Sequence, residues 1–143
     1  MRYVKTFLKW VFGAFFVGGG VGHFVNEGFY LDIMPDYIPE QLHRPAVLIS
    51  GVFEVLLGVL LVIPRTTRLA AWGLIALLIA VFPANIYAFQ HSEEIFGISR
   101  SVHFWRLPLQ NVMIAWAYWY TRPENREKTI HAATESDQSA TLE

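Results

Sequence analysis

One carboxyl group lies deep inside the apolar part of the chain, and its chemistry is the first question that the sequence raises. Glu54 is the only Asp, Glu, Lys or Arg within four apolar runs, at residues 10–25, 46–63, 69–89 and 107–120. A charge in membrane hydrocarbon costs about 3 kcal/mol, so we expect this carboxyl to face a bundle interior, neutral or paired. Gly51 and Gly58 share its helix face and would let another helix approach closely. Glu54 is then either a ligand or proton site, or a group that only joins two helices.

Polar side chains on the other three runs fall in the same half of a membrane. His23 ends the first run, Asn85 lies within about one turn of the end of the third, and Gln110 lies within about one turn of the start of the fourth. These depths predict a shared polar cavity that opens to the outer side. Topology would place Arg106 at its rim, where it could pair with Glu27 or with the buried carboxyl.

Several kinds of chemistry are excluded by what the sequence lacks. The chain has no cysteine, so it has no disulfide, thiol nucleophile or Cys-ligated metal. Its histidines match no metal-binding motif such as HExxH, and no nucleophile elbow or phosphate-binding loop is present. The sequence therefore predicts no metal site, no catalytic residue and no resident cofactor, with a quinone or lipid as the one ligand left open.

Composition identifies a membrane protein. The chain has 143 residues, of which 54% are hydrophobic and 16% charged, with a mean hydropathy of +0.35; soluble domains carry about 25% charged residues. Of the 11 basic and 12 acidic residues, eight follow Tyr120, which leaves the preceding chain poorer still in charge. The net charge of -1 argues against nucleic acid as a partner. We expect the lipid bilayer to be the first partner of this protein.

The elements that must position the polar groups are four helices. About 20 residues span the hydrocarbon of a bilayer, and the runs with their flanks predict transmembrane helices over about 4–25, 46–63, 69–89 and 104–120. The turn at residues 64–68 is short and begins with a proline, so the second and third helices form an antiparallel hairpin. The fold class is thus an all-α integral membrane bundle of four antiparallel transmembrane helices. The segment 26–45 is expected to be an ordered loop or surface-lying piece, and 121–143 a polar, disordered cytoplasmic tail.

Basic residues predict the orientation. Eight would lie on the side of the two termini, namely Arg2, Lys5, Lys9, Arg65, Arg68, Arg122, Arg126 and Lys128. Three would lie on the other side, namely Arg44, Arg100 and Arg106. The positive-inside rule then places both termini in the cytoplasm. A cleaved signal peptide is the alternative for the N-terminus, but Lys9 interrupts its apolar run and no Ala-x-Ala site follows.

Small residues predict how the first helix packs. Ala14, Gly18 and Gly22 recur at every fourth position, which is the small-xxx-small pattern of closely packed membrane helices. We expect this ridge to contact a neighbouring helix, with His23 projecting beside it toward the bundle.

An ordered set of motifs resembles a known family. The motifs are Gly22-His-Phe24, Met34-Pro-Asp-Tyr-Ile-Pro39, Ser50-Gly-Val-Phe-Glu54, Leu69-Ala-Ala-Trp72, Phe82-Pro-Ala-Asn85 and Arg106-Leu-Pro-Leu-Gln110. Over about residues 10–120 the chain thereby resembles the DoxX-like family of small four-helix membrane proteins. The resemblance implies a multi-pass protein of the bacterial cytoplasmic (inner) membrane, in a family whose name comes from a subunit of a quinone-linked oxidase. The chain departs from the thiol-linked relatives because it has no cysteine.

Two functional hypotheses follow. The first is a non-catalytic subunit or assembly partner of a membrane complex, such as a quinone-linked redox complex, with membrane-protein partners or a homo-oligomer. The alternative is a binder of, or an enzyme acting on, a lipidic small molecule such as a quinone, through the outward-facing polar cavity around Glu54 and His23. Proton or ion conduction ranks last, because only one deep acid is present and no relay chain is visible. The sequence leaves open whether the protein is an enzyme.

Overall fold

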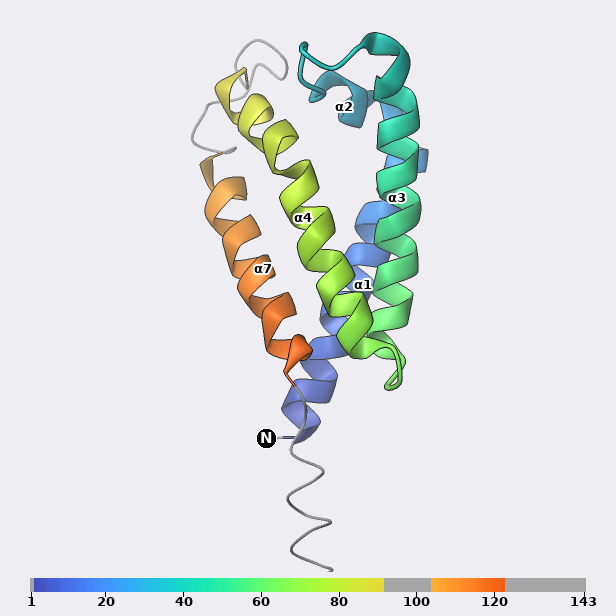
Figure 1. Cartoon of the computed structure of the whole chain (residues 1–143), viewed down its shortest axis with the longest axis vertical. Helices are drawn as coiled ribbons and strands as arrows, with labels where there is room; N and C mark the ends of the chain where they lie inside the picture. Colours follow the sequence, from blue (N-terminus) through green and yellow to red (C-terminus); the bar gives the residue numbers. More distant parts are fainter. Residues whose placement is uncertain (1, 92–103, 123–143) are drawn as a thin grey trace, which may run out of the picture.

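Helices account for all the regular structure in the described part of the chain. A computed structural model describes residues 2–91 and 104–122. Its elements are α1 (Arg2–Val25), α2 (Glu27–Asp32), α3 (Glu40–Val62), α4 (Thr67–Gln90) and α7 (Arg106–Thr121) (Figure 1). The four long helices pack antiparallel, which confirms the predicted all-α bundle. Residues 92–103, between α4 and α7, and residues 123–143 of the predicted tail lie outside the described residues.

Three of these helices are long and apolar enough to cross a membrane. The candidate spans are Tyr3–Val25, Glu40–Val62 and Thr67–Gln90. At 16 residues α7 is shorter, about 24 Å at 1.5 Å per residue, and it packs along α4. Large apolar side chains cover the outer surface of the bundle, among them Phe7, Val11, Ile49, Leu56 and Ile79. Such a surface suits lipid and not water, so the chain is a small multi-pass membrane protein.

The largest difference from the predicted elements is at the start of α3. This helix begins at Glu40, six residues before the predicted start, and continues through Pro45. A proline this close to a helix N-terminus removes only one backbone hydrogen bond, that to the carbonyl of Gln41. The segment predicted as an ordered, surface-lying piece therefore contains α2 and the first residues of α3. The other long helices begin and end within two residues of the predicted positions.

Backbone contact between α1 and α3 is made possible by two pairs of glycines. A Cβ atom at Gly20 would lie 2.6 Å from the carbonyl oxygen of Gly51, and one at Gly13 would lie 2.8 Å from that of Gly58. The prediction that Gly51 and Gly58 admit another helix is thereby confirmed. Gly13 and Gly20 of α1 are seven residues apart, as are Gly51 and Gly58 of α3, so the two glycines of each helix lie almost on one face. They form a continuous groove for the other helix.

The predicted ridge of Ala14, Gly18 and Gly22 does not form this contact, and that expectation is wrong. A Cβ atom at Gly18 would meet nothing within 4 Å, and Ala14 is exposed. Gly22 lies against Tyr30, whose hydroxyl would be 2.9 Å from an added Cβ. Helix α1 carries two overlapping series of small residues, and spacing alone does not tell which series faces the neighbouring helix.

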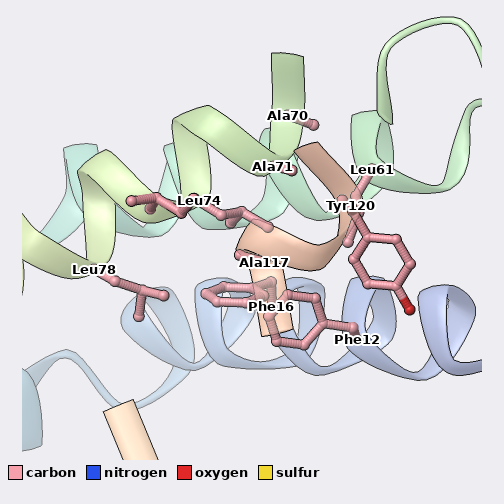
Figure 2. Close-up of a cluster of buried hydrophobic side chains, with 10 residues drawn as sticks. Phe12, Phe16, Leu61, Ala70, Ala71, Leu74, Leu78, Ala117 and Tyr120 are labelled. Carbon is pink, nitrogen blue, oxygen red and sulfur yellow. The ribbon is translucent and has the colours of Figure 1, made fainter. Parts of the chain in front are cut away.

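The buried core fills one end of the bundle, which we call the turn end because it contains the turn at residues 63–66 between α3 and α4. The four long helices contribute Phe12, Phe16, Leu61, Ala70, Ala71, Leu74, Leu78, Ala117 and Tyr120 to one cluster (Figure 2). The Phe12 ring stacks on Trp116 with centroids 4.6 Å apart, and the Tyr120 hydroxyl donates to the backbone carbonyl of Lys5 at 3.2 Å. Toward the opposite end, which contains α2, the α1/α3 pair and the α4/α7 pair splay apart (Figure 1).

The glycine contact predicts that alanine at Gly20 and alanine at Gly18 change the free energy of unfolding in opposite directions. Gly20→Ala would force its methyl group against the backbone of α3, so we expect the free energy of unfolding to fall by about 1–3 kcal/mol. Gly18→Ala enters open space, and its better helix propensity should raise stability by up to about 1 kcal/mol. Unfolding in mixed detergent micelles, followed by circular dichroism, measures both. Equal effects of the two substitutions would contradict this packing of α1 on α3.

Candidate functional site

A cavity of about 490 Å³ lies between the two helix pairs, in the half of the bundle nearer α2. All five helices contribute to its wall, which is largely apolar. Its polar lining side chains are His23, Tyr30, Tyr37, Ser50, Glu54, Asn85 and Gln110. The volume falls within the range of about 300–1,000 Å³ that is typical of small-molecule sites. Four of the five residues singled out in the sequence thus lie on the wall of one cavity.

His23 and Glu54 form a buried pair on the α1/α3 side of this cavity. His23 Nε2 lies 3.4 Å from Glu54 Oε1, and the two side chains are 8% and 16% exposed. The other ring nitrogen, Nδ1, is 2.8 Å from the backbone carbonyl of Val47 and 3.1 Å from Ser50 Oγ. The Ser50 hydroxyl donates to the same carbonyl at 2.9 Å. The His23 ring also stacks on Tyr30, with centroids 3.7 Å apart.

These contacts indicate which ring nitrogen of His23 carries a hydrogen and leave two arrangements for the contact with Glu54. A carbonyl oxygen only accepts, so Nδ1 of His23 carries the hydrogen that faces Val47. Nε2 of a neutral ring is then an acceptor, and it would repel an ionised carboxylate unless a proton lies between them. Either Glu54 is neutral and donates to the ring, or the ring is cationic and donates to a carboxylate. In both forms a hydrogen bond would join Nε2 to the carboxyl, and both side chains line the cavity.

Glycines make the space for this pair. A Cβ atom at Gly51 would lie 2.7 Å from the Cβ of His23, so only glycine lets the histidine lie this close to α3. A Cβ at Gly19 would lie 3.0 Å from Glu54 Oε2. The same contact that joins α1 to α3 therefore also seats the polar pair.

Asn85 and Gln110 join α4 to α7 on the other side of the cavity. Asn85 Nδ2 donates to Gln110 Oε1 at 2.7 Å, and Gln110 Nε2 donates to the backbone carbonyl of Leu78. Pro83 has no N–H for the carbonyl of Ile79, and its ring disturbs the helix turn that precedes it. The Gln110 amide thus bonds to the backbone of the disturbed turn. This arrangement explains the two residues as a structural bridge that also lines the cavity.

The two acids that Arg106 was predicted to pair with, Glu27 and Glu54, have other partners in the structure. Glu27 accepts a hydrogen bond from Arg44 Nε at 2.6 Å, and Glu54 pairs with His23. Arg106 is the first residue of α7, and its side chain lies outside the described part of the structure. The path of α2 and the early start of α3 bring Arg44 to Glu27, a contact that sequence spacing alone did not indicate. An ion pair of Arg106 stays a prediction.

Three polar residues of the cavity were missed as site residues in the sequence: Tyr30, Tyr37 and Ser50. Ser50 lies four residues before Glu54 and therefore on the same helix face, a signal that could have identified it. Tyr30 comes from the short helix α2, and no spacing pattern relates it to His23. Its hydroxyl lies 3.5 Å from the backbone carbonyl of Gly19.

The cavity reaches the outer surface beside α1 and α7. Phe15 of α1 and Leu109 of α7 both line the cavity, and they are 55% and 52% exposed. Since the surface of a membrane span faces lipid, a molecule dissolved in the bilayer could enter from the side. Among the described residues, no group of three or more His, Asp or Glu side chains is arranged to hold a metal ion. The chemistry available in the cavity is hydrogen bonding and proton exchange with a polar head group.

The bridge between α4 and α7 can be measured as a coupling energy. Asn85→Ala and Gln110→Ala should show a coupling of roughly 0.6–1.7 kcal/mol in a double-mutant cycle, as for polar contacts between membrane helices. Asn111→Ala is the control, since Asn111 is exposed and its Nδ2 donates only to Leu107 of its own helix. Detergent-induced unfolding supplies the free energies. Additive effects of Asn85→Ala and Gln110→Ala would mean that the bridge does not form.

Comparison with known proteins gives one family. No curated protein and no solved structure matches the chain. A family model matches over residues 12–121, a stretch that runs from near the middle of α1 to the last residue of α7 and includes all the residues that line the cavity. The comparison makes no assignment to the DoxX-like family, so that resemblance stays a prediction. Because the match covers well over half of the chain, the protein belongs to the family described as "Domain of unknown function (DUF8561)".

Proposed function

We propose that this membrane protein binds an amphipathic small molecule of the bilayer in the cavity between its two helix pairs. The observation that carries the proposal is the cavity itself, about 490 Å³ with apolar walls and a buried His–Glu pair. Ligand sites commonly combine an apolar enclosure with a few polar groups that orient the ligand. The apolar body of the molecule would lie against residues such as Phe16 and Met113, with its head at His23 and Glu54.

The contrast between the two ends of the bundle supports an occupant. At the turn end the helices meet through a packed core, as protein interiors normally do. An unfilled space of this size in the other half would sacrifice van der Waals contacts along its whole wall. A bound lipidic molecule would replace those contacts.

The polar groups favour a head group without net charge. None of the described side chains that line the cavity is a Lys or Arg, so these side chains offer a phosphate or carboxylate no fixed cation. The proton held by His23 and Glu54 can be donated to a carbonyl oxygen, and Glu54 can accept from a hydroxyl. A quinone or quinol combines such groups with an apolar body. Binding of this class of molecule would agree with the DoxX-like resemblance of the sequence.

A subunit or assembly role in a membrane complex is a second candidate. Ala14 and Gly18 lie on the outer face of α1, with open space beside Gly18. Small residues on an outer face allow a helix of another protein to approach closely. Crosslinking in native membranes, with Gly18→Leu as the interfering variant, tests this role: a partner lost in that variant supports it, and a monomer throughout counts against it.

The distribution of charge supports one orientation in the membrane. Lys5, Lys9, Arg65, Arg68 and Arg122 all lie near the turn end. We infer that this end faces the cytoplasm of a bacterial inner membrane, with both termini inside and the cavity nearer the outer surface.

Lipid mass spectrometry tests the binding proposal. Protein extracted in a gentle detergent should retain an amphipathic molecule in roughly stoichiometric amount. Glu54→Gln and His23→Ala should each weaken its retention about tenfold, because each removes a hydrogen bond of the buried pair. Glu27→Gln is the matched control, since Glu27 also pairs with a basic side chain but does not line the cavity.

The size of the cavity provides a second arm of the experiment. Ala84→Trp would fill part of the cavity from α4 without altering the polar pair, and it should also reduce retention. If the molecules bound to wild-type protein, to Glu54→Gln and to Ala84→Trp are the same in kind and amount, the proposal is wrong.

A further inference from the structure

We propose that a second pocket, at the turn end, binds the phosphate group of an anion, and that an anionic phospholipid supplies it. The pocket has a volume of about 200 Å³ and lies among α1, the start of α4 and the end of α7. Its polar lining side chains include Lys5, Lys9, Thr67, Arg68, Tyr120 and Arg122. Four cationic side chains thus share the wall of one small pocket, well removed from the cavity that lies toward α2.

No carboxylate of the described residues balances these cations. The described acids are Glu27, Asp32, Asp36 and Glu40, in or near α2 and the start of α3, and Glu54 in the middle of α3. The one described cation near the α2 end, Arg44, is already paired with Glu27. Like charges gathered at a membrane surface repel one another, so an anion bound between them would lower the electrostatic energy of this end.

Two of the cations, Lys5 and Arg122, lie over aromatic rings. The Lys5 ammonium lies over the rings of Trp119 and Tyr120, at 5.6 and 5.9 Å from the centroids, and the Arg122 guanidinium lies 5.3 Å from the Tyr118 centroid. These cation–π contacts orient the two side chains without neutralising them. The hydroxyls of Thr67 and Tyr120 already donate to backbone carbonyls, so the cationic side chains would make the contacts with a phosphate.

The position of the pocket suits a lipid head group. Exposed aromatic side chains surround the turn end, among them Trp10, Trp72, Tyr118 and Trp119. Such residues concentrate at the interface between hydrocarbon and head groups, and basic pockets between helices at this level bind anionic lipid heads. A free phosphate ion presents the same chemistry from the aqueous side, so the experiment must distinguish the two sources.

Native mass spectrometry of the full-length protein provides the test. The probes are dioctanoyl phosphatidylglycerol, phosphatidylcholine with the same chains, and inorganic phosphate. We expect phosphatidylglycerol to bind more tightly than phosphatidylcholine, because the ammonium group of the latter would face the cations. Arg68→Gln should weaken phosphatidylglycerol binding about fivefold, and Lys5→Gln with Arg68→Gln roughly 25-fold, since each charge near the surface contributes about equally.

Arg65→Gln is the matched control. Arg65 lies in the turn, three residues before Arg68 of α4, and carries the same charge, but it does not line the pocket. Its substitution should change affinity less than twofold, and circular dichroism should give the same helix content for every variant. Equal loss in Arg65→Gln and Arg68→Gln, or equal binding of the two lipids, would overturn the site in favour of general attraction to a charged surface.

Competition by inorganic phosphate identifies the source. Release of phosphatidylglycerol by millimolar phosphate would support a phosphate site but overturn the assignment to a lipid. Retention in its presence would support the lipid head group. Binding of none of the probes would overturn the whole proposal. Because the cavity around His23 and Glu54 is a separate site, these outcomes do not depend on the proposed binding of an amphipathic molecule there.

Discussion

The close contact of α1 with α3 is the constraint on which the rest of the structure depends. Gly13 faces Gly58 and Gly20 faces Gly51, so the two backbones meet where a methyl group would already be too large. In lipid no hydrophobic effect draws helices together, and such backbone proximity is a main source of stability. It also places His23 against the carbonyl of Val47, and the polar pair exists because the helices are this close.

The second helix pair joins the first mainly at the turn end, and this asymmetry creates the cavity. Helices α3 and α4 are linked by a short turn, so their neighbouring ends must lie together, and the core cluster fills the space between them. Among the described residues, no comparable cluster joins the pairs near α2, where α4 contains Pro83 and the Asn85–Gln110 bridge ties α4 to α7 and not to α3. Two rigid pairs that meet at one end must enclose a wedge-shaped space at the other.

Sequence predicted the number and direction of the helices because these depend on quantities that sequence carries directly. The thickness of a bilayer fixes the length of an apolar run. The short turn predicted at residues 64–68 makes the chain reverse its direction. Depth was also predictable, since it is counted along the helix. The rotation of each helix and the partners of its side chains were not predictable. Gly18 belongs to a series of small residues on α1, but Gly13 and Gly20 are the glycines that face α3. The pairing of Glu27 with Arg44 depends on the path taken by α2. A one-residue shift rotates a helix face by about 100°, so small differences in packing change every lateral contact.

One face of α1 connects all these features and fixes their depth. Lys5 and Lys9 line the basic pocket, Phe12 lies in the core, and Phe16 and His23 line the larger cavity. Their spacings of four, three, four and seven residues keep them on a single stripe. From Lys5 to His23 the helix rises about 27 Å, close to the thickness of the hydrocarbon layer. If the basic end is held at one head-group region, His23 lies near the opposite boundary and Glu54 lies deeper. A membrane-soluble molecule could place a polar head at His23 while its body remains in the apolar part of the cavity.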